Sequence, residues 1–205
     1  MEFLKTISLI VAICFASFVN AQTQQQLQYA FSKSYSLEAE KKYSDAISQL
    51  TAVYAESSYE INLRLGWLQC LNADYTKSVS YYKKCIALMP VATEPLWGIL
   101  KPYAAQNDWA KVEATYKNII KIDPRNSVAH YWLGVIFYNR KDYTSAKKYL
   151  DVSLNLNPFD YDVLLMSAWT NYFLGNNSEA KTLFNKVLLS HPYDKSALDG
   201  LALIK

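Results

Sequence analysis

Four of the six prolines recur at one fixed interval along the chain. They are Pro90, Pro124, Pro158 and Pro192, and each follows the one before it by the same step. Three further columns keep the same interval: Gly66, Leu100, Gly134, Ala168 and Ala202; Tyr75, Trp109, Tyr143 and Asn177; and Ser78, Val112, Ala146 and Ala180. Proline lacks an amide hydrogen and restricts the residue before it, so each proline predicts the end of a helix. A period of about 34 residues indicates stacked repeats, each burying its apolar face only against its neighbours.

Small and large side chains within one period fit a pair of crossing helices. We expect the small residues of the first helix to let two backbones approach closely: Gly66, Gly134, Ala168 and Ala202. We expect large residues of the second helix to fill the gap between neighbouring repeats: Tyr82, Tyr116, Leu150 and Phe184. Polar residues such as Asn72-Ala73-Asp74 and Gln106-Asn107-Asp108 predict the turn between the two helices, where they satisfy free backbone groups.

This pattern resembles the tetratricopeptide repeat, which has a period of about 34 residues and runs W-x2-L-G-x2-Y, then A-x3-F, then P. Leu65-Gly66 and Leu133-Gly134 match the L-G pair, and Ala46, Ala146 and Ala180 match the small residue of the second helix. The resemblance implies an all-α fold, a right-handed α-solenoid of about five helix-turn-helix repeats with a C-terminal capping helix. The expected repeats cover residues 27–58, 59–92, 93–126, 127–160 and 161–194, and the cap covers 195–205.

The first residues have the features of an export signal. Lys5 is followed by an almost wholly apolar run from Thr6 to Val19, and then by Asn20-Ala21. A helix that spans a membrane needs about 20 apolar residues, so the run is too short for one. A short apolar run after a positive charge, ending in a small residue, is typical of a secretory signal peptide. We therefore expect a signal peptide over 1–21, a short linker over 22–26, and an exported protein in the periplasm or cell envelope of a bacterium, or secreted.

The resemblance also implies a concave groove lined by the first helices of the repeats. Carried onto this sequence, it predicts a groove lined mainly by aromatic side chains: Phe31, Tyr35, Trp67, Trp97, Lys101, Tyr131, Tyr138, Trp169 and Tyr172. Further groove positions are Glu38, Glu60, Leu63, Cys70, Glu94, Val135, Asn139, Asp162 and Leu165. Exposed aromatic surface is typical of interaction sites. The alternative is that these rings only pack on one another as part of the core.

Three functions remain open on the sequence. The first is a non-catalytic scaffold or adaptor that binds a protein or peptide segment in the aromatic groove. The second is a module for a glycan or another small envelope ligand, in which carboxylates such as Glu60 and Glu94 lie beside the rings. The third is a structural subunit of an envelope assembly, because the apolar segment 197–204 suggests a covered end. The lysine and asparagine pattern with which one subclass of the family binds a C-terminal carboxylate is absent here.

Composition excludes several other classes of protein. The chain has 21 basic and 18 acidic residues and a net charge of +3, without the clustered basic stripe expected of a nucleic-acid-binding protein. The many lysines of the second helices predict a solvated outer surface, with envelope association as the alternative. His130 fits a packing position and His191 a solvated turn, and neither belongs to a known catalytic motif. We therefore expect no enzyme activity, no cofactor and no metal site.

Two cysteines remain once the signal peptide is excluded. Cys85 occupies the small-residue position of a second helix, where burial is expected, and Cys70 is expected to face the groove. A disulfide needs Cα atoms within about 7 Å and converging Cβ directions. Because the expected directions diverge, we predict two free thiols.

Overall fold

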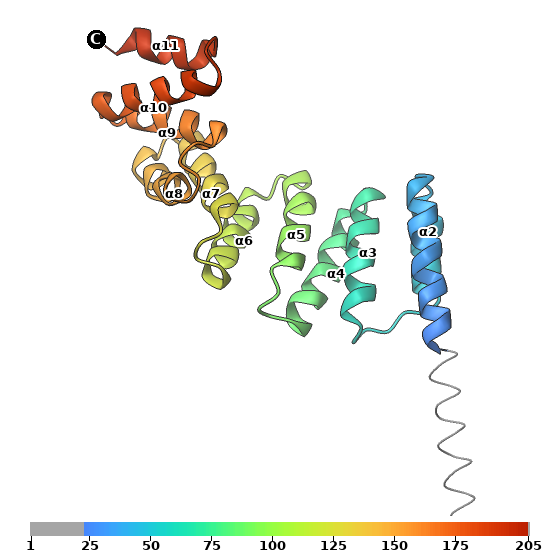
Figure 1. Ribbon diagram of the computed structural model, residues 1–205. Helices are drawn as coiled ribbons and strands as arrows, with labels where there is room; N and C mark the ends of the chain where they lie inside the picture. Colours follow the sequence, from blue (N-terminus) through green and yellow to red (C-terminus); the bar gives the residue numbers. More distant parts are fainter. Residues whose placement is uncertain (1–22, 205) are drawn as a thin grey trace, which may run out of the picture. The chain divides into compact units, whose positions relative to one another are not determined.

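Every regular element in residues 23–204, the part of the chain that the computed structural model describes, is a helix (Figure 1). The chain divides after Gln106 into two compact units. The first, unit 1, holds a helix over residues 23–39 followed by α2 (Tyr43–Thr51), α3 (Tyr59–Leu71), α4 (Tyr75–Leu88) and α5 (Glu94–Ala105). The second, unit 2, holds α6 (Trp109–Ile122), α7 (Ser127–Asn139), α8 (Tyr143–Leu156), α9 (Tyr161–Phe173), α10 (Asn177–Ser190) and α11 (Lys195–Leu203). The predicted all-α fold is confirmed.

Side-chain caps explain where the helices begin. Asp74, Asp108 and Asp142 recur at the same interval as the prolines, and each accepts a hydrogen bond from the backbone amide at the third position after it. Asp160 and Asp194 cap α9 and α11 in the same way. Such a cap satisfies an amide that has no partner inside the helix and contributes about 1 kcal/mol. The polar turn residues therefore do what the sequence predicted of them.

The turn inside each repeat ends the preceding helix with a residue in the left-handed conformation. These residues have φ between 60° and 77°, and they are Lys41, Ala73, Asn107, Lys141 and Gly175. The amide that follows donates back across the last helical turn, as in the 2.9 Å bond from Asp74 to the carbonyl of Gln69. Only Gly175 adopts this conformation without a steric cost, so the other turns carry some backbone strain.

In unit 1, one tyrosine ring lies between two glycines. A Cβ at Gly66 would lie 3.0 Å from the ring of Tyr82, and one at Gly98 would lie 2.3 Å from it. The tyrosine is 2% exposed, so the ring fills the space that the two glycines leave. This contact confirms the predicted roles of Gly66 and Tyr82 and adds Gly98, which the periodic columns had not singled out.

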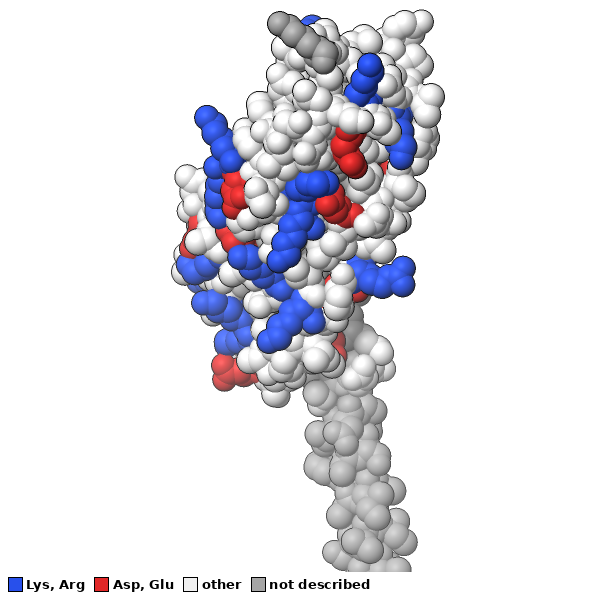
Figure 2. All heavy atoms as spheres, turned by 90° about the vertical axis from the view of Figure 1, so that its left-hand side faces the viewer, with Lys and Arg blue, Asp and Glu red and all other residues white. Residues whose placement is uncertain are grey.

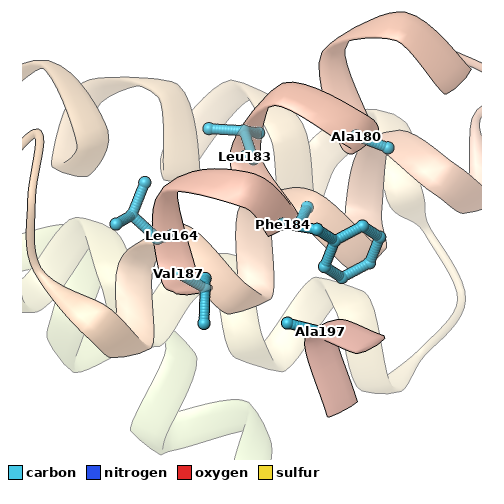
Figure 3. Close-up of a cluster of buried hydrophobic side chains, with 7 residues drawn as sticks. Leu164, Ala180, Leu183, Phe184, Val187 and Ala197 are labelled. Carbon is cyan, nitrogen blue, oxygen red and sulfur yellow. The ribbon is translucent and has the colours of Figure 1, made fainter. Parts of the chain in front are cut away.

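Unit 2 packs by the same rule around Leu150 and Phe184. A Cβ at Gly134 would meet Leu150 at 2.5 Å, and one at Gly200 would meet Phe184 at 2.3 Å. Phe184 belongs to a buried apolar cluster whose members come from α9, α10 and α11 (Figure 3): Leu164, Ala168, Ala180, Leu183, Phe184, Val187 and Ala197. The prediction that Ala202 lies at a close helix crossing is wrong, because Ala202 is exposed. No second helix follows α11 within the described residues, so nothing packs on that position.

The two ends of the array differ from the sequence prediction in one respect. The predicted linker over 22–26 is helical from residue 23 onward. Glutamine is frequent in this segment and has a high helix propensity. The predicted signal peptide over 1–21 lies outside the described residues. Among residues 23–204, no helix is both long enough and apolar enough to cross a membrane. At the other end, α11 exposes the side chains of Leu198 and Leu203.

Candidate functional site

Unit 1 contains a pocket of about 590 Å³. Three helices supply most of its wall, namely the helix over 23–39, α3 and α5, and Tyr82 of α4 also lines it. The lining residues are Phe31, Tyr35, Tyr59, Glu60, Leu63, Arg64, Trp67, Tyr82, Glu94 and Gly98. The wall therefore combines apolar and aromatic surface with a few charged groups, which is typical of binding sites in proteins.

A buried arginine organises one side of the pocket. The guanidinium of Arg64 lies 2.5 Å from the carboxylate of Glu38 and 3.8 Å from the ring centre of Tyr35. Its Nε donates to the hydroxyl of Ser34 at 3.2 Å. The second oxygen of Glu38 accepts the indole N–H of Trp67 at 2.7 Å. One carboxylate thus joins the helix over 23–39 to two side chains of α3.

The arginine is almost wholly removed from water. Arg64 is 7% exposed, and its Nη2 has no hydrogen-bond partner within residues 23–204. A buried donor without a partner costs free energy, about 1–3 kcal/mol for a neutral group and more for a charged one. The pairing with Glu38 neutralises the charge of Arg64, while the Nη2 donor stays unsatisfied. Positions of this kind in folded proteins call for an explanation such as a ligand or a bound water.

Two further carboxylates give the pocket a negative potential. Glu60 and Glu94 are exposed at the start of α3 and α5, and the hydroxyl of Tyr59 donates to Glu94 at 3.2 Å. Burial, together with the charges of these two glutamates, raises the pKa of Tyr59 to about 12. The same causes, burial first, raise the pKa of the Cys85 thiol to about 11. Both shifts favour the uncharged form, as expected beside negative charge.

The groove positions of unit 2 are in a different environment. Trp169 contacts the rings of Tyr172, Phe173 and Phe184, with ring centres 5.6, 6.0 and 5.1 Å away. Tyr138 lies 5.9 Å from the ring of Phe173. The indole N–H of Trp169 donates to Ser196 at 2.9 Å. In this unit Trp169 therefore contacts both Tyr172 and the core ring of Phe184, and Tyr138 contacts Phe173.

The structure therefore divides the nine predicted groove residues. Phe31, Tyr35 and Trp67 line the pocket, and the ammonium of Lys101 lies 5.7 Å from the ring centre of Trp67. The side chain of Trp97 is half-buried on α5. The other four belong to unit 2 and do not line this pocket: Tyr131, Tyr138, Trp169 and Tyr172.

Sequence reasoning missed Tyr59, Arg64, Tyr82 and Gly98 as pocket residues. Arg64 had a signal in the repeat register. It shares a column with Gly98, Trp132, Met166 and Gly200, at the same interval as the prolines, and is the only charged residue among them. A single charge in an otherwise uncharged column indicates a special environment. Gly98 and Gly200 share that column and the same contact with a large ring.

The remaining chemistry-bearing residues have structural surroundings. Cys70 and Cys85 are free thiols, and both are buried. Cys70, which was expected to face the groove, is buried, with 4% of its surface exposed. His130 is buried, with Nε2 3.0 Å from the carbonyl of Pro124, and His191 is exposed, both as expected. Residues 23–204 hold no group of three or more His, Cys, Asp or Glu side chains that could bind a metal ion.

The basic side chains of the second helices are mixed with acidic ones. Lys117 pairs with Glu113 at 2.6 Å and Lys147 with Asp151 at 2.9 Å. Figure 2 shows Lys and Arg side chains spread over one face, with Asp and Glu side chains beside several of them. A solvated surface of mixed sign fits this arrangement better than a binding site for an anionic polymer.

Comparison with protein families identifies the repeats. Two family models, both described as tetratricopeptide repeat, match residues 103–161 and 162–192. Residues 103–192 are tetratricopeptide repeats. The helix pairs of unit 1 follow the same packing rule. A search of curated protein sequences gives no significant match.

Solved structures of tetratricopeptide-repeat proteins share the fold. A tetratricopeptide repeat protein from Parabacteroides merdae is similar with a TM-score of 0.72 at 20% identity, over 87% of this chain and 72% of that one. The crystal structure of MamA protein gives 0.69 at 14% identity, over 83% and 97%. MamA from Desulfovibrio magneticus gives 0.67 at 15% identity, over 83% and 98%. At these identities the likeness concerns the fold alone.

Proposed function

We propose that the protein is a non-catalytic scaffold that binds a segment of a partner protein in the pocket of unit 1. Tetratricopeptide repeats are generally protein-interaction modules, and the MamA-like structural neighbours share this fold. The observation that carries the proposal is the convergence of three helices on one pocket, with Tyr35 and Trp67 exposed at its wall. Exposed Trp and Tyr side chains in a concave site are typical anchors of protein interfaces.

Affinity isolation of the full-length protein from the cells that make it tests this function. The informative variant is Trp67→Ala, which removes a pocket ring. Trp132→Ala is the matched control, because Trp132 is a similarly exposed tryptophan (44% against 40%) on a first helix of unit 2. We expect a partner protein that is retained by the wild type and by Trp132→Ala and is lost from Trp67→Ala. Equal retention by both variants would contradict a binding role for this pocket.

A glycan is the second candidate ligand, and one observation favours it. The carboxylates of Glu60 and Glu94 stand beside aromatic rings in the same pocket, which is the arrangement expected of a sugar site. Titration with chitotriose and maltotriose, followed through the indole N–H resonance of Trp67, tests this alternative. A saturable shift with either sugar would support the glycan function, and no shift up to millimolar concentration would reject these two sugars as ligands.

We further propose that the protein acts outside the cytoplasm, after removal of residues 1–21. The support is the short apolar run after Lys5, which ends in a small residue. N-terminal sequencing of the protein isolated from its own cells gives a direct test. We expect the mature chain to begin at Gln22, and an intact Met1 or a start elsewhere would contradict the cleavage site.

A further inference from the structure

The pocket of unit 1 carries two carboxylates without a cationic partner. Neither Glu60 nor Glu94 forms an ion pair within residues 23–204. Each accepts a neutral hydrogen bond instead, Glu60 from the hydroxyl of Ser58 at 3.0 Å and Glu94 from that of Tyr59 at 3.2 Å. The second oxygen of each carboxylate is therefore available to a donor from outside.

The cations near the pocket do not neutralise the two carboxylates of Glu60 and Glu94. Arg64 is paired with Glu38, and its charge is neutralised there. The ammonium of Lys101 lies over the ring of Trp67. Because the Arg64–Glu38 pair is neutral, the two negative charges of Glu60 and Glu94 are opposed only by the one positive charge of Lys101. The pocket therefore retains net negative charge. The contacts of Arg64 with Tyr35 and of Lys101 with Trp67 also show that ring faces in this region attract cations.

We propose that this pocket receives a lysine or arginine side chain of the partner segment, with its charged group between Glu60 and Glu94. The inference rests on the proposed function and specifies the chemistry of the segment. An ammonium carries three donors and a guanidinium five, which suits a pocket rich in acceptors. The alkyl stem packs against aromatic surface such as Tyr35 and Trp67. A backbone carbonyl of the same segment supplies the acceptor that the buried Nη2 of Arg64 lacks.

The test is a titration of the full-length protein with a pair of short peptides. The probes are acetyl-Gly-Lys-Gly-amide and acetyl-Gly-norleucine-Gly-amide, which differ only in the ammonium group. Binding is followed through the indole N–H resonance of Trp67. The variant Glu60→Gln/Glu94→Gln removes both charges and keeps the side-chain shape. The control is Glu179→Gln, a similarly exposed glutamate in the first turn of α10 in unit 2.

We expect the lysine peptide to bind the wild type and Glu179→Gln, and to bind the double variant at least about 10-fold more weakly. We also expect added salt to weaken this binding, and the norleucine peptide to bind poorly throughout. Equal binding of both peptides, or no loss in the double variant, would overturn the inference. Binding of neither peptide would overturn it as well.

A failure of this inference can be told apart from a failure of the proposed function. The double variant is also used in the affinity isolation with the partner protein. If Trp67→Ala loses the partner and the double variant retains it, the pocket binds protein without using a cation. If both retain it, the pocket is not the binding site at all.

Discussion

Helices α3 and α9 show how one repeat pattern produces two different surfaces. They lie three repeat periods apart, and they share Tyr59 with Tyr161, Leu63 with Leu165, and Trp67 with Trp169. In unit 1 the indole of Trp67 binds the helix over 23–39 through Glu38, and the ring stays 40% exposed. In unit 2 the indole of Trp169 binds α11 through Ser196, and the ring packs on Phe184 of α10.

The residues between these shared positions account for the difference. Arg64 of α3 is replaced by Met166 in α9, and Asn62 by Leu164. Arg64 recruits Glu38 and stacks on Tyr35, so charged and aromatic groups line the wall of a pocket. Leu164 instead joins the apolar cluster that holds Phe184. Repeat position thus determines where a side chain lies, while its neighbours decide whether it faces the pocket or the core.

The largest expected effect comes from removing the ring at the centre of the unit 2 core. Phe184 is fully buried, and Phe184→Ala should lower the free energy of unfolding by about 3–5 kcal/mol. Phe173→Ala is the control, because Phe173 contacts the same Trp169 ring as Phe184 but is 47% exposed. Urea unfolding followed by circular dichroism measures both. A loss for Phe184→Ala no larger than for Phe173→Ala would contradict the packing described for unit 2.

The next largest effect is expected from breaking the ion pair of Arg64 and Glu38 in unit 1. Arg64→Met leaves the carboxylate of Glu38 without its partner, and we expect a loss of about 2–3 kcal/mol, since Glu38 retains some contact with water. The double variant Arg64→Met/Glu38→Gln should recover much of this loss, because no unpaired charge remains. Thermal and urea unfolding of Arg64→Met, of Glu38→Gln and of the double variant give the coupling energy between the two side chains. Additive losses would show that the two groups do not interact as described.

The repeat register allowed much of the fold to be predicted, and less of the site. The fixed spacing of the prolines, and of the columns that contain Gly66 and Ala146, can be read directly from the sequence. The helix pairs and their close contacts could therefore be predicted from it. The pocket depends on a pair that the repeat register does not specify, Arg64 with Glu38, which occurs in unit 1 and has no counterpart in the Met166 position of α9. Ala202 shows the converse, because it keeps its place in the column but no described helix follows to pack on it.

A smaller effect concerns the left-handed turn residues, which occur in both units. Ala73→Gly in unit 1 and Lys141→Gly in unit 2 should each raise the free energy of unfolding by about 0.5–1 kcal/mol, because glycine tolerates positive φ. Gly175→Ala should lower it by about 1 kcal/mol or more for the same reason. Melting temperatures of the three variants test this. Opposite signs for Ala73→Gly and Lys141→Gly would mean that the turns are not equivalent in the two units.

The smallest effect is on the titration of Tyr59. Its pKa is raised from 10.0 to about 12 by burial and then by Glu94. The unfolded chain therefore loses this proton at lower pH than the folded one, and the stability due to Tyr59 is lost as pH rises from about 10 to about 12. Glu94→Gln should lower this pKa without returning it to 10.0, since burial remains. Carbon-13 NMR of labelled tyrosine measures the shift, and an unchanged pKa would place Glu94 away from Tyr59.

We propose that the pocket of unit 1, and not the group of rings around Trp169 in unit 2, binds the partner protein. Leu63 and Leu165 offer a direct test, because both are half-buried leucines at the same repeat position. The measurement is photo-crosslinking in intact cells, with a diazirine amino acid placed at one position or the other. We expect a discrete protein adduct at Leu63 and none at Leu165. An adduct at Leu165 alone would contradict it.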